Sequence, residues 1–391
     1  MICNINLCTG CGACAILCPA ECIEMTTDES GFYVPNICNE KCIDCGICKI
    51  KCPQNITINH LTDYESKAYA FIHCDNNILL NSSSGGAFMA LAEFTIKKCG
   101  YVFGAIYDDS FAVVTKSTNF INGLLPMQGS KYVECLSVDS YRVAKKYLDE
   151  GKQVLYTGTP CRIAGLYSVL GNKAYSNLIT VEILCHGVPS NKLFMAYLSY
   201  VQDRYGKIFS YTFRDKSKWG WGAWGNFHYK KGNKEKVHYF SAKTDYYYSM
   251  FYTDNCFRES CYRCKYACQS RVANITIGDC WGIEKIWPVD KYKNGVSIIV
   301  TNNLIGEHFI FDAVGTTNLS KLDMSWVIQN NPTFIKPTRR PTSRDKFYGD
   351  FIQYGFIYSA KKYVKIQRFM PLLLRYVPRK LKTRIKRIIY N

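Results

Sequence analysis

Two copies of one cysteine pattern near the start of the chain constrain its fold more than any other feature. Each copy has four cysteines with a proline directly after the fourth, and the two copies comprise Cys8, Cys11, Cys14 and Cys18, then Cys42, Cys45, Cys48 and Cys52. The chain has 391 residues and 21 cysteines, an odd number, and 11 of them lie within the first 52 residues. In a chain of this length, such density favours metal binding over a framework of disulfides.

The spacing within each copy, C-x2-C-x2-C-x3-C-P, is typical of bacterial ferredoxins with two [4Fe-4S] clusters. There, the first three cysteines of a copy bind one cluster and the fourth reaches the other. The pattern therefore predicts one cluster on Cys8, Cys11, Cys14 and Cys52, and a second on Cys42, Cys45, Cys48 and Cys18. Two structural zinc sites are the alternative, although these usually pair two C-x2-C halves. We expect Cys3, Cys22 and Cys38, which fall outside the pattern, to be packed thiols.

After Pro53 the sequence alternates between strand-like and helix-like segments. Short apolar runs predict strands over 67–73, 101–107, 153–156, 179–184 and 296–301. Helical spacing predicts helices over 87–98, from the loop at Pro160 to about 170, and from Pro189 to 202. A turn is expected at 75–77 and a hairpin tip at 230–234. This order predicts an α/β core (α+β overall) with a partly parallel sheet, whose sites gather at the carboxyl ends of the strands.

Two loops that open predicted helices are candidates for phosphate binding. The first contains Ser82, Ser83, Ser84, Gly85 and Gly86, which offer hydroxyls, free N–H groups and the positive end of a helix dipole. An ordinary serine N-cap explains the same residues equally well. The second contains Thr157, Gly158, Thr159 and Cys161, between a predicted strand and the next helix.

A second group of cysteines, Cys256, Cys261, Cys264 and Cys268, lies among basic side chains. We expect this group to bind a third [4Fe-4S] cluster, with structural zinc as the alternative. The irregular spacing leaves the fourth ligand open. Cys268 can supply it, or Cys161 or Cys185 can reach the group from a loop of the sheet.

Aromatic residues gather between positions 211 and 229, close to Arg214 and Lys216. Exposed rings beside cations would stack on a flat ring such as a flavin, a base or a sugar. The alternative, which we favour, is an aromatic hairpin that closes the core. The residues concerned are Tyr211, Phe213, Trp219, Trp221, Trp224 and Phe227.

The chain is basic, with a formal net charge of +18, and the excess is strongest at its end. From Phe351 to Asn391 there are 11 Lys or Arg residues and no Asp or Glu. This segment predicts a basic amphipathic tail for an anionic membrane surface or an acidic partner. A helix packed on its own domain is the alternative. No known nucleic-acid reading motif accompanies the charge, so we expect no nucleic acid as a partner.

The apolar stretches of the chain are too short to span a membrane. They stop well short of the roughly 20 residues that a membrane span needs. The N-terminus has no basic region followed by an apolar run, so we expect no signal peptide. The sequence therefore predicts a cytoplasmic protein, with the tail at the inner face of the membrane.

Several motifs together resemble the coenzyme F420 hydrogenase/dehydrogenase beta-subunit family, in its branch with a fused N-terminal double-cluster ferredoxin domain. The resemblance runs from about Cys8 to Asn302 and extends more weakly to about Phe347. Its motifs are Ser82-Ser83-Ser84-Gly85-Gly86, Gly158-Thr159-Pro160-Cys161, Cys185-His186-Gly187-Val188-Pro189, Phe213-Arg214-Asp215-Lys216, Cys261-Tyr262-x-Cys264 and Ile277-Gly278-Asp279-x-Trp281-Gly282.

The resemblance implies a bacterial-type ferredoxin domain fused to a mixed-sheet flavin-binding domain. We expect a double-cluster domain over 1–60, an α/β region over 61–145, a flavin and iron–sulfur region over 146–320 and a basic extension over 321–391. The implied activity is that of an oxidoreductase in which FAD exchanges electron pairs with an organic substrate and single electrons with clusters. The loops Ser82–Gly86 and Thr157–Cys161 are the candidates to hold FAD.

The resemblance also indicates partners. Members with the fused domain often accompany polysaccharide biosynthesis, and we expect a redox partner protein or soluble electron donor together with an unknown organic substrate. No motif singles out a deazaflavin pocket, so coenzyme F420 itself is not expected. Two other classes fit the same residues: an electron-carrier subunit with no substrate of its own, and a basic docking protein whose clusters are structural.

Overall fold

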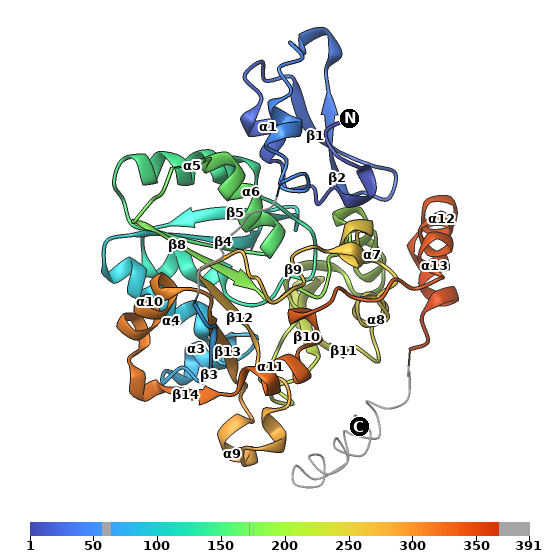
Figure 1. The fold of residues 1–391 in the computed structure, drawn as a ribbon. Helices are drawn as coiled ribbons and strands as arrows, with labels where there is room; N and C mark the ends of the chain where they lie inside the picture. The colour runs from blue at the N-terminus through green and yellow to red at the C-terminus, as the bar shows by residue number, and fades with distance from the viewer. Residues whose placement is uncertain (57–63, 172, 367–391) are drawn as a thin grey trace.

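The computed structural model describes residues 1–56, 64–171 and 173–366, and within these ranges the strands form three sheets (Figure 1). The smallest sheet belongs to an N-terminal lobe, in which β1 (Ile23–Thr27) pairs antiparallel with β2 (Tyr33–Ile37). Each cysteine loop leads into a short helix, α1 (Ala13–Leu17) or α2 (Ile47–Ile50). Each helix follows a glycine in the left-handed conformation, Gly12 or Gly46, so the repeat in the sequence is also a repeat in the structure.

A nine-stranded mixed sheet lies at the centre of the described chain, in the order β14-β3-β13-β12-β8-β7-β4-β5-β6. Strands β12, β8, β7 and β4 are parallel neighbours, and β13 runs antiparallel to both β12 and β3. The carboxyl ends of β3, β12, β8 and β7 therefore share one edge, which is where ligands bind in open α/β sheets. The strands are β3 (Lys67–Phe71), β4 (Tyr101–Tyr107), β5 (Val113–Thr118), β6 (Cys135–Leu136), β7 (Val154–Gly158), β8 (Leu178–Ile183), β12 (Ile275–Asp279), β13 (Ser297–Thr301) and β14 (Leu319–Leu322).

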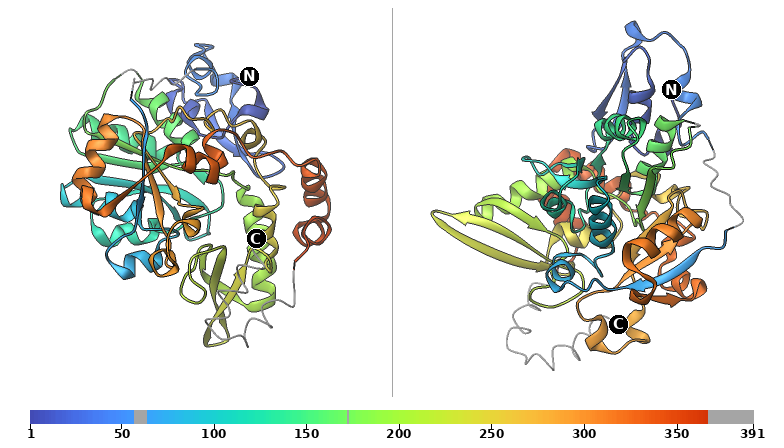
Figure 2. Two further views of the ribbon diagram at one scale, coloured as in Figure 1. Left: turned by 60° about the horizontal axis from the view of Figure 1, so that its bottom comes forward. Right: turned by 90° about the vertical axis from the view of Figure 1, so that its left-hand side faces the viewer.

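Helices cover both faces of this sheet (Figure 2). The helices α4 (Ala87–Lys97) and α10 (Leu304–Val314) bury apolar side chains against one face. On the other face pack α5 (Val138–Asp149) and α6 (Pro160–Leu170), and Ala13 of α1 is buried in the same core. The N-terminal lobe therefore docks on α5 and α6 of this face through the helix that carries Cys14. The shorter helices are α3 (Asn76–Asn81), α9 (Val289–Tyr292) and α11 (Met324–Asn330).

A third, aromatic unit projects from the side of the molecule (Figure 2). Its antiparallel sheet consists of β9 (Lys207–Thr212), β10 (Trp224–Lys231) and β11 (Lys234–Ser241), with the predicted hairpin tip between the last two. The unit shares one aromatic core with the helices around it, including the rings of Phe194, Tyr197, Phe213 and Tyr247. Those helices are α7 (Asn191–Tyr205), α8 (Tyr246–Tyr252), α12 (Arg344–Tyr354) and α13 (Phe356–Tyr363).

The predicted α/β class is confirmed, and so are the strands at 67–73, 101–107, 153–156, 179–184 and 296–301 within a few residues at their ends. The predicted turn at 75–77 is wrong. Asp75 is instead the N-cap of α3, and its carboxylate accepts hydrogen bonds from the Asn77 and Ile78 amides. An Asp followed by two Asn residues is typical of turns and of helix starts alike, so composition could not separate them.

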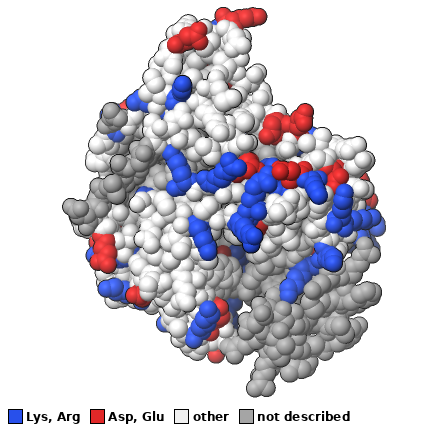
Figure 3. Space-filling model, turned by 45° about the vertical axis from the view of Figure 1, so that its right-hand side comes forward, with Lys and Arg blue, Asp and Glu red and all other residues white. Residues whose placement is uncertain are grey.

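The basic C-terminal segment lies partly within the described residues. Its beginning forms part of α12 and all of α13, and α13 packs against α12, α7 and α8. Residues 367–391 lie outside the described ranges. None of the helices in the described part of the chain has the length and apolar character that a membrane crossing requires. On the face shown in Figure 3, Lys and Arg side chains form a band in which acidic side chains are interspersed.

Candidate metal and cofactor centre

The first three cysteines of the first copy lie beside Cys52, as the crossed pattern predicts. Cys14 is within electrostatic reach of Cys8, Cys11 and Cys52, and we call these four residues the proximal group. The Gly10 amide donates a hydrogen bond to Cys8 Sγ at 3.4 Å, and the amides of Ala13, Ala15 and Gln54 donate to the other three sulfurs. Such N–H···S bonds favour sulfur ligands of iron–sulfur clusters, so this donor set fits a four-iron cluster.

The second set of cysteines is assembled in the same crossed way. Cys48 is within electrostatic reach of Cys45 and Cys18, and Cys42 lies near Cys18 through the thiol of Cys22. We call Cys18, Cys42, Cys45 and Cys48 the distal group. Amides of Ala20, Glu21 and Cys22 donate to Cys18. Cys45 is exposed, so this group lies at the protein surface.

Two cysteines outside the repeat lie closer to these groups than we expected. The Cys3 thiol is hydrogen-bonded to Cys8 and Cys52, and Cys22 Sγ lies 3.4 Å from Cys18 Sγ. Cys38 is exposed. The spacing pattern could not reveal the first two contacts, because they depend on how the start of the chain and β1 fold back over the loops.

A third set of cysteines meets at the carboxyl edge of the central sheet. Cys185 is within electrostatic reach of Cys161, Cys261 and Cys264, and we call these four residues the inner group. Cys161 lies at the start of α6, Cys185 follows β8, and the other two belong to the 3-10 helix η4 (Glu259–Arg263) and its C-terminal end. Burial raises the pKa of Cys264 to about 11 and that of Cys261 to about 12, so without a metal these thiols carry protons.

The other two cysteines predicted for this cluster have different surroundings, although Cys256 interacts electrostatically with Cys261. Cys256 is fully buried in the aromatic core, where its carbonyl accepts a hydrogen bond from the Tyr348 hydroxyl. The Cys268 thiol donates to the carbonyls of Lys265 and Ser270 at 3.3 and 3.2 Å. The structure thus brings Cys261 and Cys264 together with the two sheet-loop cysteines that the sequence left as alternatives.

Among the described residues, no three His, Cys, Asp or Glu side chains are arranged to hold a metal ion. A four-iron cubane takes one thiolate on each of four irons, so its ligands do not converge on one point. The finding is therefore compatible with four-iron clusters at the three groups.

The proximal and inner groups approach each other where the lobe docks on α6. Gly165 follows Cys161 by one helical turn on α6, and a methyl group placed on it would lie 3.1 Å from Cys11 Cβ. On the other side, Tyr266 is buried within electrostatic reach of Cys11, Cys52, Cys161 and Cys264. The Gln54 side-chain amide donates to the Tyr266 hydroxyl at 3.3 Å. About one helical turn thus separates ligands of the two groups.

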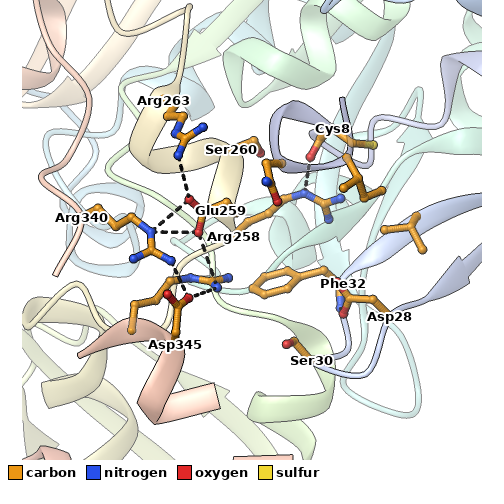
Figure 4. Close-up of a pocket in the computed structure, with 14 residues that line it drawn as sticks. Cys8, Asp28, Ser30, Phe32, Arg258, Glu259, Ser260, Arg263, Arg340 and Asp345 are labelled. Carbon is orange, nitrogen blue, oxygen red and sulfur yellow. Dashed lines mark hydrogen bonds and ion pairs between the residues drawn. The ribbon is translucent and has the colours of Figure 1, made fainter. Parts of the chain in front are cut away.

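A cavity of about 560 Å³ opens beside the proximal group (Figure 4). Arg258, Arg340 and Arg344 line it together with Cys8. Arg340 Nε donates to both oxygens of Glu259 at 3.0 Å, and Arg344 Nη1 lies 3.5 Å from the same carboxylate. Because these guanidiniums are paired with protein carboxylates, the network ties the C-terminal segment to η4.

The serine loop predicted to hold phosphate is stabilised by protein contacts. Ser84 Oγ lies 2.7 Å from Ser297 Oγ, and Ser83 Oγ accepts hydrogen bonds from the amide and hydroxyl of Ser130. Ser82 Oγ donates to the Ile78 carbonyl at 2.8 Å. A methyl group on Gly85 would lie 2.1 Å from the Phe71 carbonyl, so this glycine is required by close packing. The serine hydroxyls are thus engaged within the protein.

The surroundings of the serine loop are nevertheless cationic. The Arg214 guanidinium donates to both Asp279 oxygens at 2.7 and 2.9 Å and to the Ser83 carbonyl at 3.2 Å, while its buried Nε has no hydrogen-bond partner. Lys216 Nζ donates to the carbonyls of Leu79 and Ser84. Burial, reinforced by Arg214, lowers the pKa of Lys216 to about 7. Arg214 and Lys216 thus face one carboxylate, that of Asp279, and one guanidinium N–H has no partner. These surroundings fit an anionic group such as the diphosphate of FAD.

The second predicted flavin loop, Thr157–Cys161, lies at the end of β7 on the same edge. Thr157 Oγ1 donates to the Phe103 carbonyl at 2.7 Å, and Thr159 Oγ1 lies 3.3 Å from Cys161 Sγ. A methyl group on Gly158 would meet nothing closer than Arg162 Cβ at 3.4 Å. This loop therefore presents Cys161 to the inner group and leaves space beside Gly158.

The aromatic segment at 211–229 belongs mainly to the core. Phe213 and Phe227 are fully buried in the aromatic unit, which supports the hairpin interpretation. Trp221 differs, since it stacks on Trp281 with ring centroids 5.0 Å apart and donates from Nε1 to Asp279 at 3.0 Å. Arg214 lies over the Trp281 ring at 5.5 Å. Trp221 and Trp281 therefore form a pair of stacked rings beside Arg214 and Asp279.

The fold and the site define an α/β protein in which four cysteines gather at the carboxyl edge of a mixed sheet. Residues 151–324 match the family described as the C terminus of the beta subunit of coenzyme F420 hydrogenase/dehydrogenase. The expected resemblance is thereby confirmed for this region. The family that it matches is one of oxidoreductase subunits of the hydrogenase/dehydrogenase type. The N-terminal ferredoxin domain and the division into four regions stay predictions.

A solved structure of the F420-reducing [NiFe] hydrogenase complex from Methanosarcina barkeri, obtained with xenon derivatization, contains a chain similar to this one. The two are 16% identical, with a TM-score of 0.44, over 75% of this chain and 90% of that chain. The comparison with curated proteins finds no match.

Proposed function

We propose that the protein is an FAD- and iron–sulfur-dependent oxidoreductase that passes electrons between three [4Fe-4S] clusters and a flavin. The observation that carries this proposal is the continuous series of cysteine groups, from the exposed distal group through the proximal group to the inner group. The inner group lies at the carboxyl edge of the sheet, where Arg214 and Lys216 surround the serine loop. FAD, when bound there, would supply exchange between single electrons and electron pairs.

The ligands of the third cluster in this proposal are Cys161, Cys185, Cys261 and Cys264. Amides of Gly187, Val188 and Tyr266 donate to three of these sulfurs, as they would around a cluster. Cys256 and Cys268 are left out, because one is enclosed by aromatic rings and the other bonds to backbone carbonyls.

The substrate and the partners follow from the resemblance and from the charge. We infer a redox partner protein or soluble donor that reaches the exposed distal group, and an organic substrate that reacts beside Trp221 and Trp281. A role in polysaccharide biosynthesis, at the inner face of the membrane, is the setting that the fused domain and the basic segment favour.

Anaerobic purification with iron, sulfide and flavin quantified per chain tests the proposal. We expect about 12 iron atoms, from three four-iron clusters, and one FAD. An iron content of about eight atoms per chain would contradict the third cluster. Zinc in place of iron would contradict the electron-transfer function. Clusters without flavin would favour the alternative of an electron carrier with no substrate of its own.

Four cysteine variants separate the two ligand sets for the third cluster. Cys161→Ser and Cys185→Ser should each lower the iron content from about 12 to about 8 atoms, because each removes a ligand of the inner group. Cys256→Ala and Cys268→Ala are the matched controls and should retain about 12. Iron loss confined to the latter pair would restore the set predicted from the sequence.

A further inference from the structure

A buried ionic triad, Arg162–Glu134–Arg258, lies in the interior between the lobe and the sheet. Glu134 is completely buried, and its Oε1 lies 2.8 Å from Arg258 Nη1 and 3.3 Å from Arg162 Nη2. Its Oε2 accepts a hydrogen bond from the Tyr33 amide at 3.1 Å. Both guanidiniums are almost fully buried, so two positive charges and one negative charge are enclosed together.

On one side the triad touches the proximal group. Arg258 Nε donates to the Cys8 carbonyl at 2.6 Å, and its Nη2 donates to the Tyr33 carbonyl at 2.8 Å. A methyl group placed on Gly10 would lie 2.9 Å from both Arg258 Nη1 and Glu134 Oε1. The first cysteine loop therefore rests directly on the triad, with a glycine at the point of closest approach.

On the other side the triad reaches the inner group. Arg162 directly follows Cys161 and is within electrostatic reach of both Cys161 and Cys11. Arg258 precedes η4 and is within electrostatic reach of both Cys8 and Cys261. Each guanidinium thus interacts with cysteines of both groups. Arg162 Nη1 is buried without a hydrogen-bond partner, which leaves one N–H available to an acceptor that the protein itself does not provide.

A buried triad of this kind is costly to fold unless its excess charge is balanced. Two anionic clusters would supply that balance, one on each side. Reduction adds one electron, and hence one negative charge, to a cluster, and a nearby positive charge stabilises the reduced form. We propose that the Arg162–Glu134–Arg258 triad raises the reduction potentials of the proximal and inner clusters together. This inference rests on the proposed function, because it requires both clusters.

Variants of opposite charge test the inference in the full chain, by redox titration followed by electron paramagnetic resonance. Glu134→Gln removes the negative charge and should raise both potentials. Arg162→Met removes a positive charge and should lower them, whereas Arg162→Lys keeps the charge and should stay near the wild type. We expect each shift to be at least a tenfold change in the reduction equilibrium, which is about 59 mV for a one-electron couple.

Two controls accompany these variants. The distal cluster is an internal reference, because its cysteines do not contact the triad, and its potential should not move. Glu307→Gln removes another buried carboxylate, whose partners are Lys67 and Tyr64, and should leave all potentials unchanged.

Opposite shifts at unchanged iron and sulfide content would support the inference. Unmoved potentials, or shifts in the same direction for Glu134→Gln and Arg162→Met, would overturn it while leaving the proposed function intact. If Glu134→Gln assembles no clusters, the comparison of Arg162→Met with Arg162→Lys decides. Wild-type protein without iron after strictly anaerobic handling would overturn the proposed function, and this inference with it.

Discussion

Single residues decide which cysteines can share a cluster. Cys18 ends the first loop, yet its neighbours are Cys22 and the cysteines of the second loop. Cys18 is the C-cap residue of α1, so this helix separates it from Cys8 and Cys11. The arrangement supports crossed ligation in a form that mutation can check.

We predict that Cys18→Ala disrupts the distal cluster and spares the proximal one. Iron content should fall from about 12 to about 8 atoms, because one four-iron cluster loses a ligand. Electron paramagnetic resonance of the reduced protein identifies which signal disappears. Cys38→Ala, a variant of an exposed thiol outside both groups, should change neither signal. Loss of the proximal signal with a retained distal signal would refute the pairing.

A second prediction at this scale concerns the pH dependence of FAD binding. The pKa of Lys216 is lowered to about 7 by burial and Arg214, so this side chain gains its positive charge as the pH falls through 7. FAD, which is anionic, should therefore bind more tightly at pH 6 than at pH 8.5, by severalfold. Titration of flavin fluorescence measures this, and Lys216→Met should abolish most of the dependence. Lys98→Met, at the far end of α4, is the matched control. An unchanged profile in Lys216→Met would exclude Lys216 as its source.

At the scale of elements, α6 joins the lobe to the sheet through a glycine. A methyl group on Gly165 would lie 2.6 Å from the Tyr141 hydroxyl and 3.1 Å from Cys11 Cβ, so neighbouring elements would have to move apart. We predict that Gly165→Ala lowers the free energy of unfolding by about 1–3 kcal/mol, as overpacking does. Gly349→Ala on α12 meets nothing within 4 Å and should be neutral or stabilising by up to about 1 kcal/mol. Thermal unfolding of both variants checks the contrast, which equal effects would contradict.

The elements that sequence reasoning predicted well are those with local signals. Apolar runs located β3, β4, β7, β8 and β13, and the cysteine repeat located the two loops, because each signal lies within a few neighbouring residues. The inner group was less predictable, since Cys161 and Cys185 join Cys261 and Cys264 across the sheet. The triad was missed entirely. Glu134, Arg162 and Arg258 are isolated charged residues in the sequence, and their shared burial depends on the docking of the lobe.

At the scale of the whole molecule, the beginning of the basic segment is structural. Phe356, Ala360 and Val364 are buried in the aromatic core, so α13 follows the alternative of a helix packed on its own domain. The prediction of a membrane-binding tail concerns residues 367–391, which lie outside the described residues. The charge pattern alone does not argue against a truncation at Tyr358. That truncation would nevertheless remove more than half of α13 and two of these buried side chains.

We predict different outcomes for two truncations. Ending the chain after Ile366 should keep cluster and flavin content and abolish salt-sensitive binding to anionic vesicles, because most of the basic residues are lost. Ending it at Tyr358 should also lower the thermal stability, since apolar contacts of α13 disappear. Vesicle co-sedimentation at low and high salt, with thermal unfolding, measures both effects. The prediction would be contradicted if truncation after Ile366 caused loss of flavin. It would also be contradicted if the full-length protein did not bind anionic vesicles at low salt.

The docking of the lobe through Arg258 has a kinetic consequence. Its guanidinium bonds to the Cys8 and Tyr33 carbonyls on the lobe and to Glu134 on the sheet side, all within the buried interior. The lobe is thus held in place beside the inner group, and the effective concentration of the proximal group there is very high. Electron exchange between the proximal and inner groups should then be first order, independent of protein concentration and of salt. Exchange with an outside partner at the distal group should depend on both.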